Sequence, residues 1–277
     1  MQLAVRYSTS YRYEHQAARH VQLLRVTPNS FSGQNVLDWR VDVDSDARLR
    51  EHRDGYGNIV HMLYVDRPVE GLTIDVSGRV LTDDRAGIVA GLPNDLPHQI
   101  FLRTTPLTEA HGSLVTLAHA LAGHDRNPRD LLHHLVERLH LRMRFDTEAT
   151  AVGTSASEAY EAGHGVCQDY AHIFCAVARF LGIPARYVSG HLFRRDGLNV
   201  QPATHAWAEG WCPDLGWIAF DPTNGICADD AYVRVACGLD YRDAAPFSGT
   251  VEGGGRQSMD VRVEVQQTRQ RQMQRQQ

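Results

Sequence analysis

The chain has 277 residues, of which 43% are hydrophobic and 22% charged, so it can bury a sizeable core as one large domain or two smaller ones. Its formal net charge of -5 gives no electrostatic case for nucleic acid as a partner. The stretch from Met1 to Arg25 holds no long apolar run, and we expect neither a signal peptide nor a membrane span. Five cysteines without a CxxC pair favour a reducing compartment, which predicts a cytoplasmic protein.

The first part of the chain carries the pattern of β-strands. Alternation of apolar and polar residues recurs in four runs, at residues 3–7, 39–43, 59–65 and 72–76. Asp54 and Asn58 flank a glycine-containing stretch between two of these runs, and we interpret both as turn residues. The pattern predicts an amino-terminal antiparallel β domain over residues 1–82 and a connecting segment over residues 83–107.

The middle of the chain carries the signals of helices. These signals cover residues 108–121, 127–139 and 155–163. Asn127 followed by Pro128 is a typical cap with proline in the first turn. Ser155 and Glu158 have the spacing of a capping box. The sequence therefore predicts three helices before the region that carries the chemistry.

No residue pattern indicates a metal or cofactor site. His133, His134 and His140 lie on or beside the second predicted helix. The first two are adjacent and cannot share a helix face, so we interpret these histidines as part of a solvated helix face. The three cysteines after residue 200 also lack the spacing of metal ligands. We expect no cofactor and no metal.

A cysteine directly behind a glycine-rich turn opens the next predicted helix. Residues 167–181 contain no helix breaker, and Gly182 with Pro184 supplies the stop. Cys167 therefore lies on the first turn, where unpaired N–H groups and the helix dipole favour a thiolate and can hold an oxyanion. A free cysteine is more often a small core side chain, so a catalytic role requires partners elsewhere.

Two candidate partners follow along the chain. His205 opens a predicted strand downstream of Cys167, and Asp221 ends the next predicted strand. Residues 211–216 read as a turn, and the resulting hairpin would bring the histidine and the aspartate together at one end. Cysteine, histidine and aspartate are then nucleophile, base and orienting residue. His164 is the rival base, but the sequence supplies it with no orienting carboxylate.

Three ordered motifs resemble the core of bacterial transglutaminase-like proteins, which are often described as cysteine proteases and belong to the papain-like superfamily. The motifs are Gly165-Val166-Cys167-Gln168-Asp169-Tyr170-Ala171, His205-Ala206-Trp207 and Phe220-Asp221-Pro222-Thr223. The resemblance implies that Cys167 is the nucleophile, His205 the general base and acid, and Asp221 the orienting residue. It also implies an α+β fold in which the cysteine-bearing helix packs on an antiparallel sheet.

The resemblance extends more loosely to the start of the chain. Tyr11-Arg12-Tyr13 and the stretch from Asp54 to Asn58 are similar to the amino-terminal domain that commonly precedes this bacterial core. One residue of the animal transglutaminases has no counterpart here, because the chain has no tryptophan between Trp39 and Trp207. In those enzymes a tryptophan before the cysteine helps to stabilise the oxyanion. The backbone N–H of Cys167 is the first donor expected, and Gln168 or Tyr160 is the candidate for the second.

The domain plan places the catalytic core over residues 108–250. Apolar and polar residues alternate again from Met259 to Val265, which predicts a closing strand over residues 251–265. Residues 266–277 are rich in glutamine and arginine, and we expect a disordered tail. Its seven glutamines are potential acyl donors.

The predicted activity is cysteine-dependent acyl transfer through a thioester, on a peptide or protein substrate. Hydrolysis of a peptide or amide is the expected reaction, because water as the acceptor needs no binding pocket. Cross-linking to a primary amine and deamidation of glutamine side chains share the first half-reaction and are the alternatives. A non-catalytic binding or scaffold module is the alternative of another class.

Overall fold

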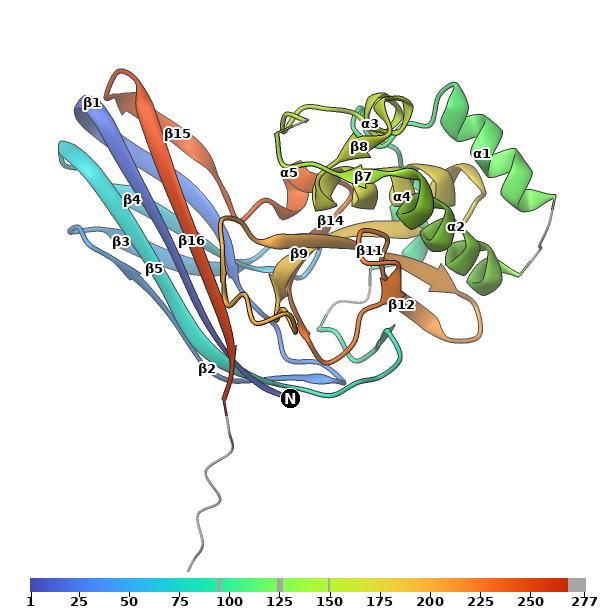
Figure 1. Ribbon diagram of the computed structural model, residues 1–277. Helices are drawn as coiled ribbons and strands as arrows, with labels where there is room; N and C mark the ends of the chain where they lie inside the picture. The colour runs from blue at the N-terminus through green and yellow to red at the C-terminus, as the bar shows by residue number, and fades with distance from the viewer. Residues whose placement is uncertain (94–95, 124–126, 149, 269–277) are drawn as a thin grey trace, which may run out of the picture.

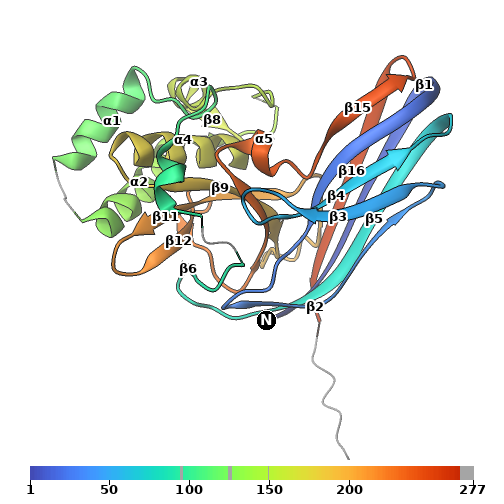
Figure 2. The same cartoon turned by 180° about the vertical axis from the view of Figure 1, so that it is seen from behind.

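The computed structural model describes residues 1–93, 96–123, 127–148 and 150–268. The fold is α+β, as predicted, and consists of a long antiparallel β-sheet beside a mixed core of helices and a second sheet (Figures 1 and 2). The helices are η1 (His98–Leu102), α1 (Ser113–Ala122), α2 (Pro128–Arg142), α3 (Ala156–Ala162), α4 (Cys167–Phe180) and α5 (Tyr241–Ala244). No helix among the described residues has the length and apolar character needed to cross a membrane.

The first sheet is organised around one long strand. Its members are β1 (Gln2–Thr27), β2 (Gln34–Val43), β3 (Arg48–Arg53), β4 (Ile59–Val65), β5 (Val69–Thr82), β10 (Val200–Gln201), β15 (Phe247–Gly253) and β16 (Gln257–Gln267). The first half of β1 pairs with β5 and β16, and the second half pairs with β4 and β15. Alternation alone predicted only residues 3–7 as the first strand. The strand continues because buried residues recur on one face and no proline occurs before Pro28.

The end of the described chain returns to this first sheet. β15 and β16 pair with β1 although they lie at the opposite end of the sequence. β16 ends at Gln267, just beyond the predicted closing strand, so Gln266 and Gln267 belong to a strand and not to the predicted tail. The rest of the predicted tail, residues 269–277, lies outside the described residues.

The second sheet carries the candidate site at one end of two neighbouring strands, β11 and β12. It comprises β6 (Ile88–Val89), β9 (Ala185–Leu192), β11 (His205–Cys212), β12 (Gly216–Asp221), β13 (Ile226–Cys227) and β14 (Tyr232–Gly238). The main strand order is β13-β12-β11-β9-β14, with β6 also on β12, and every pair is antiparallel. Helix α4 packs on β9 and β11 and is buried nearly all round. This confirms the predicted helix on an antiparallel sheet and the β11–β12 hairpin.

The predicted helix caps are present, and one helix starts later than expected. Asn127 accepts the N–H of Arg129 at 3.0 Å, and both capping-box bonds join Ser155 and Glu158. The first helix was predicted from residue 108, but α1 begins at Ser113. Thr108 is instead buried in a turn, where its hydroxyl accepts a hydrogen bond from a buried arginine of α4. A short pair of parallel strands, β7 (Arg144–Phe145) and β8 (His164–Gly165), lies before α4.

Two side-chain amides of the first sheet cover the free edge of β14. Gln34 donates to the carbonyl of Arg234 at 2.9 Å and accepts its N–H at 2.8 Å. Asn58 makes the same pair of bonds to Cys237, both at 2.8 Å. Each amide takes the place of a peptide group from a neighbouring strand. Asn58 was interpreted only as a turn residue, and it also joins the two sheets because its amide reaches beyond its own turn.

Replacing Gln34 by leucine should lower the free energy of unfolding by about 1–3 kcal/mol, because the N–H and C=O of Arg234 lose their buried partner. Urea unfolding of the full chain measures this change. Gln16→Leu is the matched control, since the Gln16 amide is exposed and its change should stay within about 0.5 kcal/mol. Equal losses in the two variants would mean that covering the β14 edge contributes nothing.

Candidate active site

The turn before α4 is built to place Cys167 at the helix start. Gly163 ends α3 in the left-handed region, with φ 73°. Asp169 then accepts the N–H of Val166 at 2.8 Å and the hydroxyl of Thr150 at 2.6 Å. A Cβ on Gly165 would lie 2.6 Å from the Asp169 carboxylate, so only glycine fits there. The carboxylate caps α4, which gives Asp169 a structural role.

Burial sets the electrostatics of this cap. The Asp169 side chain is buried, and this raises its pKa although hydrogen bonds from Thr150 and Val166 oppose the shift. Cys167 itself is partly buried and borders the apolar core of the helices. Cys167 therefore lies at the border of the core, on the first residue of α4.

The hairpin brings the other two predicted residues to the same place. His205 is the first residue of β11 and Asp221 the last of β12, and Nε2 of the histidine donates to Oδ2 of the aspartate at 2.6 Å. The Cys167 thiol lies close enough to the His205 ring to act on its charge. The structure thus brings together the three residues that the sequence analysis singled out.

Charge at this site favours a protonated imidazole. Burial lowers the pKa of His205, but the Asp221 carboxylate and the Cys167 thiol outweigh it and raise the pKa from 6.5 to about 10. Burial also raises the pKa of Asp221, and the hydrogen bonds and charge of its neighbours reverse this, so its pKa falls below the usual range. A histidine held between a carboxylate and a cysteine thiol is the arrangement expected of an activated cysteine.

Two residues that the sequence analysis did not find hold Asp221 in place. Tyr232 donates its hydroxyl to Oδ2 at 2.7 Å, and Asn224 donates its side-chain amide to the same oxygen at 2.6 Å. The backbone N–H groups of Thr223 and Asn224 donate to Oδ1 at 2.9 and 3.1 Å. Asn224 could have been suspected from its position in the turn after Asp221. Tyr232 gave no sequence signal, because β14 lies three strands away from β12 in the sheet.

Tyr232→Phe should lower the rate of Cys167 alkylation at pH 6 by about tenfold. A hydrogen bond to a charged group contributes about 1.5–3 kcal/mol, and part of this energy stabilises the imidazolium of His205 through Asp221. The rate is measured with iodoacetamide from pH 5 to 10. Tyr241→Phe is the control, because the Tyr241 hydroxyl is not among the described donors to Asp221. An unchanged pH profile with a lower melting temperature would assign Tyr232 a purely structural role.

The other histidines and Cys175 lie in different surroundings. His164 makes no hydrogen bond to a carboxylate among the residues that the structure describes, and its Nδ1 is buried without a partner. His172 points away from the site and accepts the N–H of Tyr241 at 3.1 Å. Burial raises the pKa of Cys175 to about 11, which fits a packing role. His205 is therefore the histidine with both an orienting carboxylate and the thiol.

The candidates for the second oxyanion donor have other contacts. The side-chain amide of Gln168 donates to the carbonyl of Val152 at 3.1 Å. The ring of Tyr160 is buried under the guanidinium of Arg142, 4.5 Å from the ring centroid. The role of either residue as the second donor stays a prediction.

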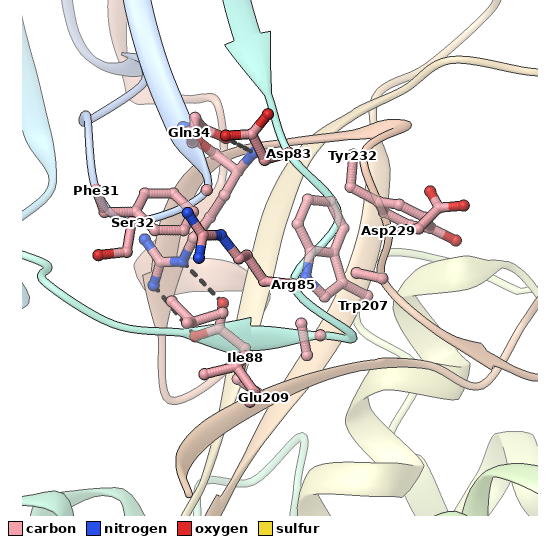
Figure 3. A pocket seen from close by; sticks show the side chains of 16 residues that line it. Phe31, Ser32, Gln34, Asp83, Arg85, Ile88, Trp207, Glu209, Asp229 and Tyr232 are labelled. Carbon is pink, nitrogen blue, oxygen red and sulfur yellow. Dashed lines mark hydrogen bonds and ion pairs between the residues drawn. The ribbon is translucent and has the colours of Figure 1, made fainter. Parts of the chain in front are cut away.

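The rings of Trp207 and Tyr232 form an aromatic wall beside His205. The ring of Trp207 stacks on His205, with centroids 6.1 Å apart, and the edge of Tyr232 meets the indole at 5.4 Å. Behind this wall is a pocket of about 50 Å³, bordered by residues 31–34 and 83–89 (Figure 3). Nε1 of Trp207 is buried there without a hydrogen-bond partner among the described residues, and the pocket has room for ordered water.

A buried charge network underlies the same wall. Glu209, on β11, accepts hydrogen bonds from Arg186 of β9 and from Arg234 of β14, the latter at 2.8 Å from Nε. Glu209 is 0% exposed and both arginines are buried. The network ties three neighbouring strands together behind His205, and the sequence analysis did not predict it.

Two family models match this chain. The model of the transglutaminase-like superfamily matches residues 115–222, and the model of the bacterial transglutaminase-like N-terminal region matches residues 3–81. The chain is 30% identical to an uncharacterized protein of Mycobacterium leprae over 275 residues, which cover 95% of this chain and 98% of that protein. It is 28% identical to a protein-glutamine gamma-glutamyltransferase of Pseudomonas aeruginosa over 155 residues, 51% of this chain and 21% of that protein.

A solved structure has the same fold. It is described as a "Putative Cysteine Protease" from Cytophaga hutchinsonii and superposes with a TM-score of 0.77 at 23% sequence identity. The match covers 97% of this chain and 92% of that chain, so both sheets and the helical core share one architecture in the two proteins.

Proposed function

This chain belongs to the transglutaminase-like superfamily and carries the bacterial transglutaminase-like N-terminal region, and we propose that it is an enzyme of cysteine-dependent acyl transfer on peptide or amide substrates. The observation that carries the proposal is the 2.6 Å bond between His205 and Asp221 beside the Cys167 thiol. A structural cysteine in the core needs neither partner. Cys167, His205 and Asp221 are accordingly the proposed nucleophile, acid and base, and orienting residue.

The proposed reaction has two half-reactions. His205 holds the proton of the Cys167 thiol, the thiolate attacks the carbonyl carbon, and the C–N bond breaks as His205 gives that proton to the departing amine or ammonia. Water or an amine then attacks the thioester, assisted by His205, and releases the thiol. Asp221 keeps the imidazole oriented and stabilises its charged form in both steps.

Hydrolysis is the preferred outcome of the second half-reaction. Water needs no acceptor pocket, and the same site performs peptide or amide hydrolysis without further groups. Cross-linking of glutamine side chains to amines is the second candidate. The similarity to the Pseudomonas aeruginosa protein-glutamine gamma-glutamyltransferase over about half of this chain favours it.

The test is mass spectrometry of a peptide pool that contains glutamine peptides and a primary amine, incubated with the protein or with Cys167→Ala. Products that depend on Cys167 support the proposal and identify the reaction. Fragments indicate a protease, glutamate in place of glutamine a deamidase, and amine adducts a transglutaminase. Identical spectra, together with a Cys167 that does not alkylate at mildly acidic pH, would favour a binding or scaffold module instead.

The proposed location is the cytoplasm. All five cysteines are free thiols in the structure, and such a set suits a reducing compartment. Fractionation of cells with detection of the full chain tests the location. Recovery in any other fraction would overturn it.

A further inference from the structure

A cavity of about 30 Å³ lies against the buried charge network of Glu209 and its two arginines. Its walls include Arg186 and Arg234 together with the rings of Phe101 and Trp217, and all four residues are buried. It is distinct from the pocket of Figure 3, although Arg234 borders both. One water molecule needs about 10–15 Å³ by this measure, so the cavity has room for two waters or for one small ion.

The buried network carries one more positive than negative charge. Arg186 and Arg234 share the single carboxylate of Glu209. Both oxygens of that carboxylate are already used, because Oε1 accepts Nε of Arg234 at 2.8 Å and Oε2 accepts Nε of Arg186 and Nη2 of Arg234. No acidic residue is among the described residues that line the cavity. An uncompensated buried charge is costly, so a counter-ion at this place would stabilise the fold.

The guanidinium of Arg186 lies at the cavity with an unused donor. Its Nη2 is closed off from solvent and has no hydrogen-bond partner in the described part of the chain. The guanidinium carbon lies 4.0 Å from the ring centroid of Trp217 and 5.6 Å from that of Phe101, and both rings are walls of the cavity. Buried polar groups are nearly always hydrogen-bonded in folded proteins, so this nitrogen indicates a missing acceptor.

The two arginines are compensated unequally. Burial lowers the pKa of Arg186, and the charge of Glu209 offsets this shift only in part. Burial acts on Arg234 in the same direction, but there the charge of Glu209 outweighs it and the pKa rises. The uncompensated positive charge is therefore concentrated at Arg186, the residue that holds the unused donor.

A further carboxylate near the cavity serves a different arginine. Asp243 accepts the hydroxyl of Tyr56, one of the wall residues, at 2.7 Å. Its charge acts on Arg179, the buried arginine of α4. Among the described ion pairs, the carboxylate bound to Arg186 and Arg234 is that of Glu209 in both cases. Asp243 thus does not supply the missing counter-charge.

We propose that this cavity binds one small monovalent anion of the size of chloride against the guanidinium of Arg186. Nη2 of Arg186 donates a hydrogen bond to the anion, and the anion makes the network with Glu209 and Arg234 neutral. The small volume excludes bulky anions such as gluconate. The site is independent of the proposed acyl transfer and would exist even if Cys167 were inactive.

Urea unfolding of the full chain at pH 7 tests the site, with sodium chloride exchanged for sodium gluconate at constant ionic strength. A ligand that binds only the folded state lowers the unfolding constant by one plus the ratio of its concentration to its dissociation constant. We expect a decrease of about tenfold at about 0.5 M chloride, which corresponds to a dissociation constant of about 50 mM. Equal stability in chloride and in gluconate would refute the proposal.

Three variants connect the chloride effect to the cavity. Arg186→Met removes both the excess charge and the unused donor, and it should abolish the dependence on chloride. Glu209→Gln increases the excess charge and should strengthen the dependence. Arg79→Met is the matched control, because Arg79 forms an exposed ion pair on the first sheet and its loss should leave the dependence unchanged. A dependence that persists in Arg186→Met would overturn the assignment to this cavity.

Bromide locates the ion in the wild-type protein, so this second measurement does not require that Arg186→Met folds. Crystals soaked in sodium bromide should show an anomalous peak in the cavity, within hydrogen-bonding distance of Nη2 of Arg186. A cavity that holds water and no bromide in such crystals would contradict the proposal.

Discussion

His205→Gln should lower the rate of Cys167 alkylation at pH 6 on the order of 10²-fold. An ordinary thiol, with a pKa near 8.5, is only about 0.3% ionised at that pH, whereas an imidazolium partner keeps the thiolate populated. Because Asp221 and Cys167 raise the pKa of His205 to about 10, the imidazole stays protonated across the neutral range. The alkylation rate is measured by quenching the iodoacetamide reaction at set times and determining the labelled fraction by intact-mass spectrometry.

The direction of the pH dependence is part of the same prediction. The difference between the wild-type protein and His205→Gln should be largest near pH 6 and should shrink toward pH 10, where the thiol ionises without help. Cys167→Ala should remove the fast labelling entirely. Cys227, the other partly buried cysteine, should not label at pH 6, since burial raises its pKa to about 11.

His164→Gln is the matched control for the choice of base. His164 lies just before Cys167 in the chain, but no carboxylate hydrogen bonds to it among the described residues. Its substitution should change the alkylation rate at pH 6 by less than about threefold. If His164→Gln slows the thiol and His205→Gln does not, the base has been assigned to the wrong histidine.

The catalytic helix and the hairpin were predictable because their determinants are local. A glycine-rich turn, a cysteine and 14 residues without a helix breaker specify α4 within one stretch of sequence. His205 and Asp221 lie on consecutive strands, so a single turn fixes their proximity. The partners of Asp221 were not predictable, since Tyr232 reaches it from another strand and no periodicity encodes that contact.

The architecture of the first sheet was only partly predictable for the same reason. Alternation identified several of its strands, but β15 and β16 reach β1 from the other end of the chain. Whether β1 ends at residue 7 or at Thr27 depends on those neighbours, because a strand is extended by the partners that pair with it. The contacts of the Gln34 and Asn58 side-chain amides could not be predicted from the sequence either. In the sequence they look like ordinary polar residues, and only the structure shows that they bind the backbone of the β14 edge.

Glu209→Gln should lower the free energy of unfolding by about 3–5 kcal/mol, since it leaves two buried arginines without a counter-charge. Burial raises the pKa of Glu209, but Arg186 and Arg234 outweigh burial and lower it below the ordinary value. The carboxylate therefore contributes stability above the unfolded-state pKa, about 4.3, and this stability is lost as the pH falls through the lower folded-state pKa. Urea unfolding of the wild-type protein and of Glu209→Gln at pH 7 and at pH 4 measures the loss of stability and its dependence on pH.

An exposed pair provides the scale for that loss. Asp38 and Arg79 form an ion pair on the surface of the first sheet, and Asp38→Asn should lower the free energy of unfolding far less than Glu209→Gln does. The contrast follows from burial, because water freely replaces the lost partner at the surface, whereas Arg186 and Arg234 are buried. Equal losses in Asp38→Asn and Glu209→Gln would show that the buried arginines are hydrated after all.

A triple variant distinguishes the need for charge from the need for packing. Arg186 lies over the ring of Trp217, 4.0 Å from its centroid, so its stem and guanidinium fill space as well as carry charge. Glu209→Leu combined with Arg186→Met and Arg234→Met keeps apolar volume and removes all three charges. It should recover most of the stability that Glu209→Gln loses. When a whole buried ion-pair network is replaced by apolar residues of similar volume, the free energy of unfolding changes little. A triple variant as unstable as Glu209→Gln would instead mean that the hydrogen bonds of the network, and not its charge balance, hold β9, β11 and β14 together behind His205.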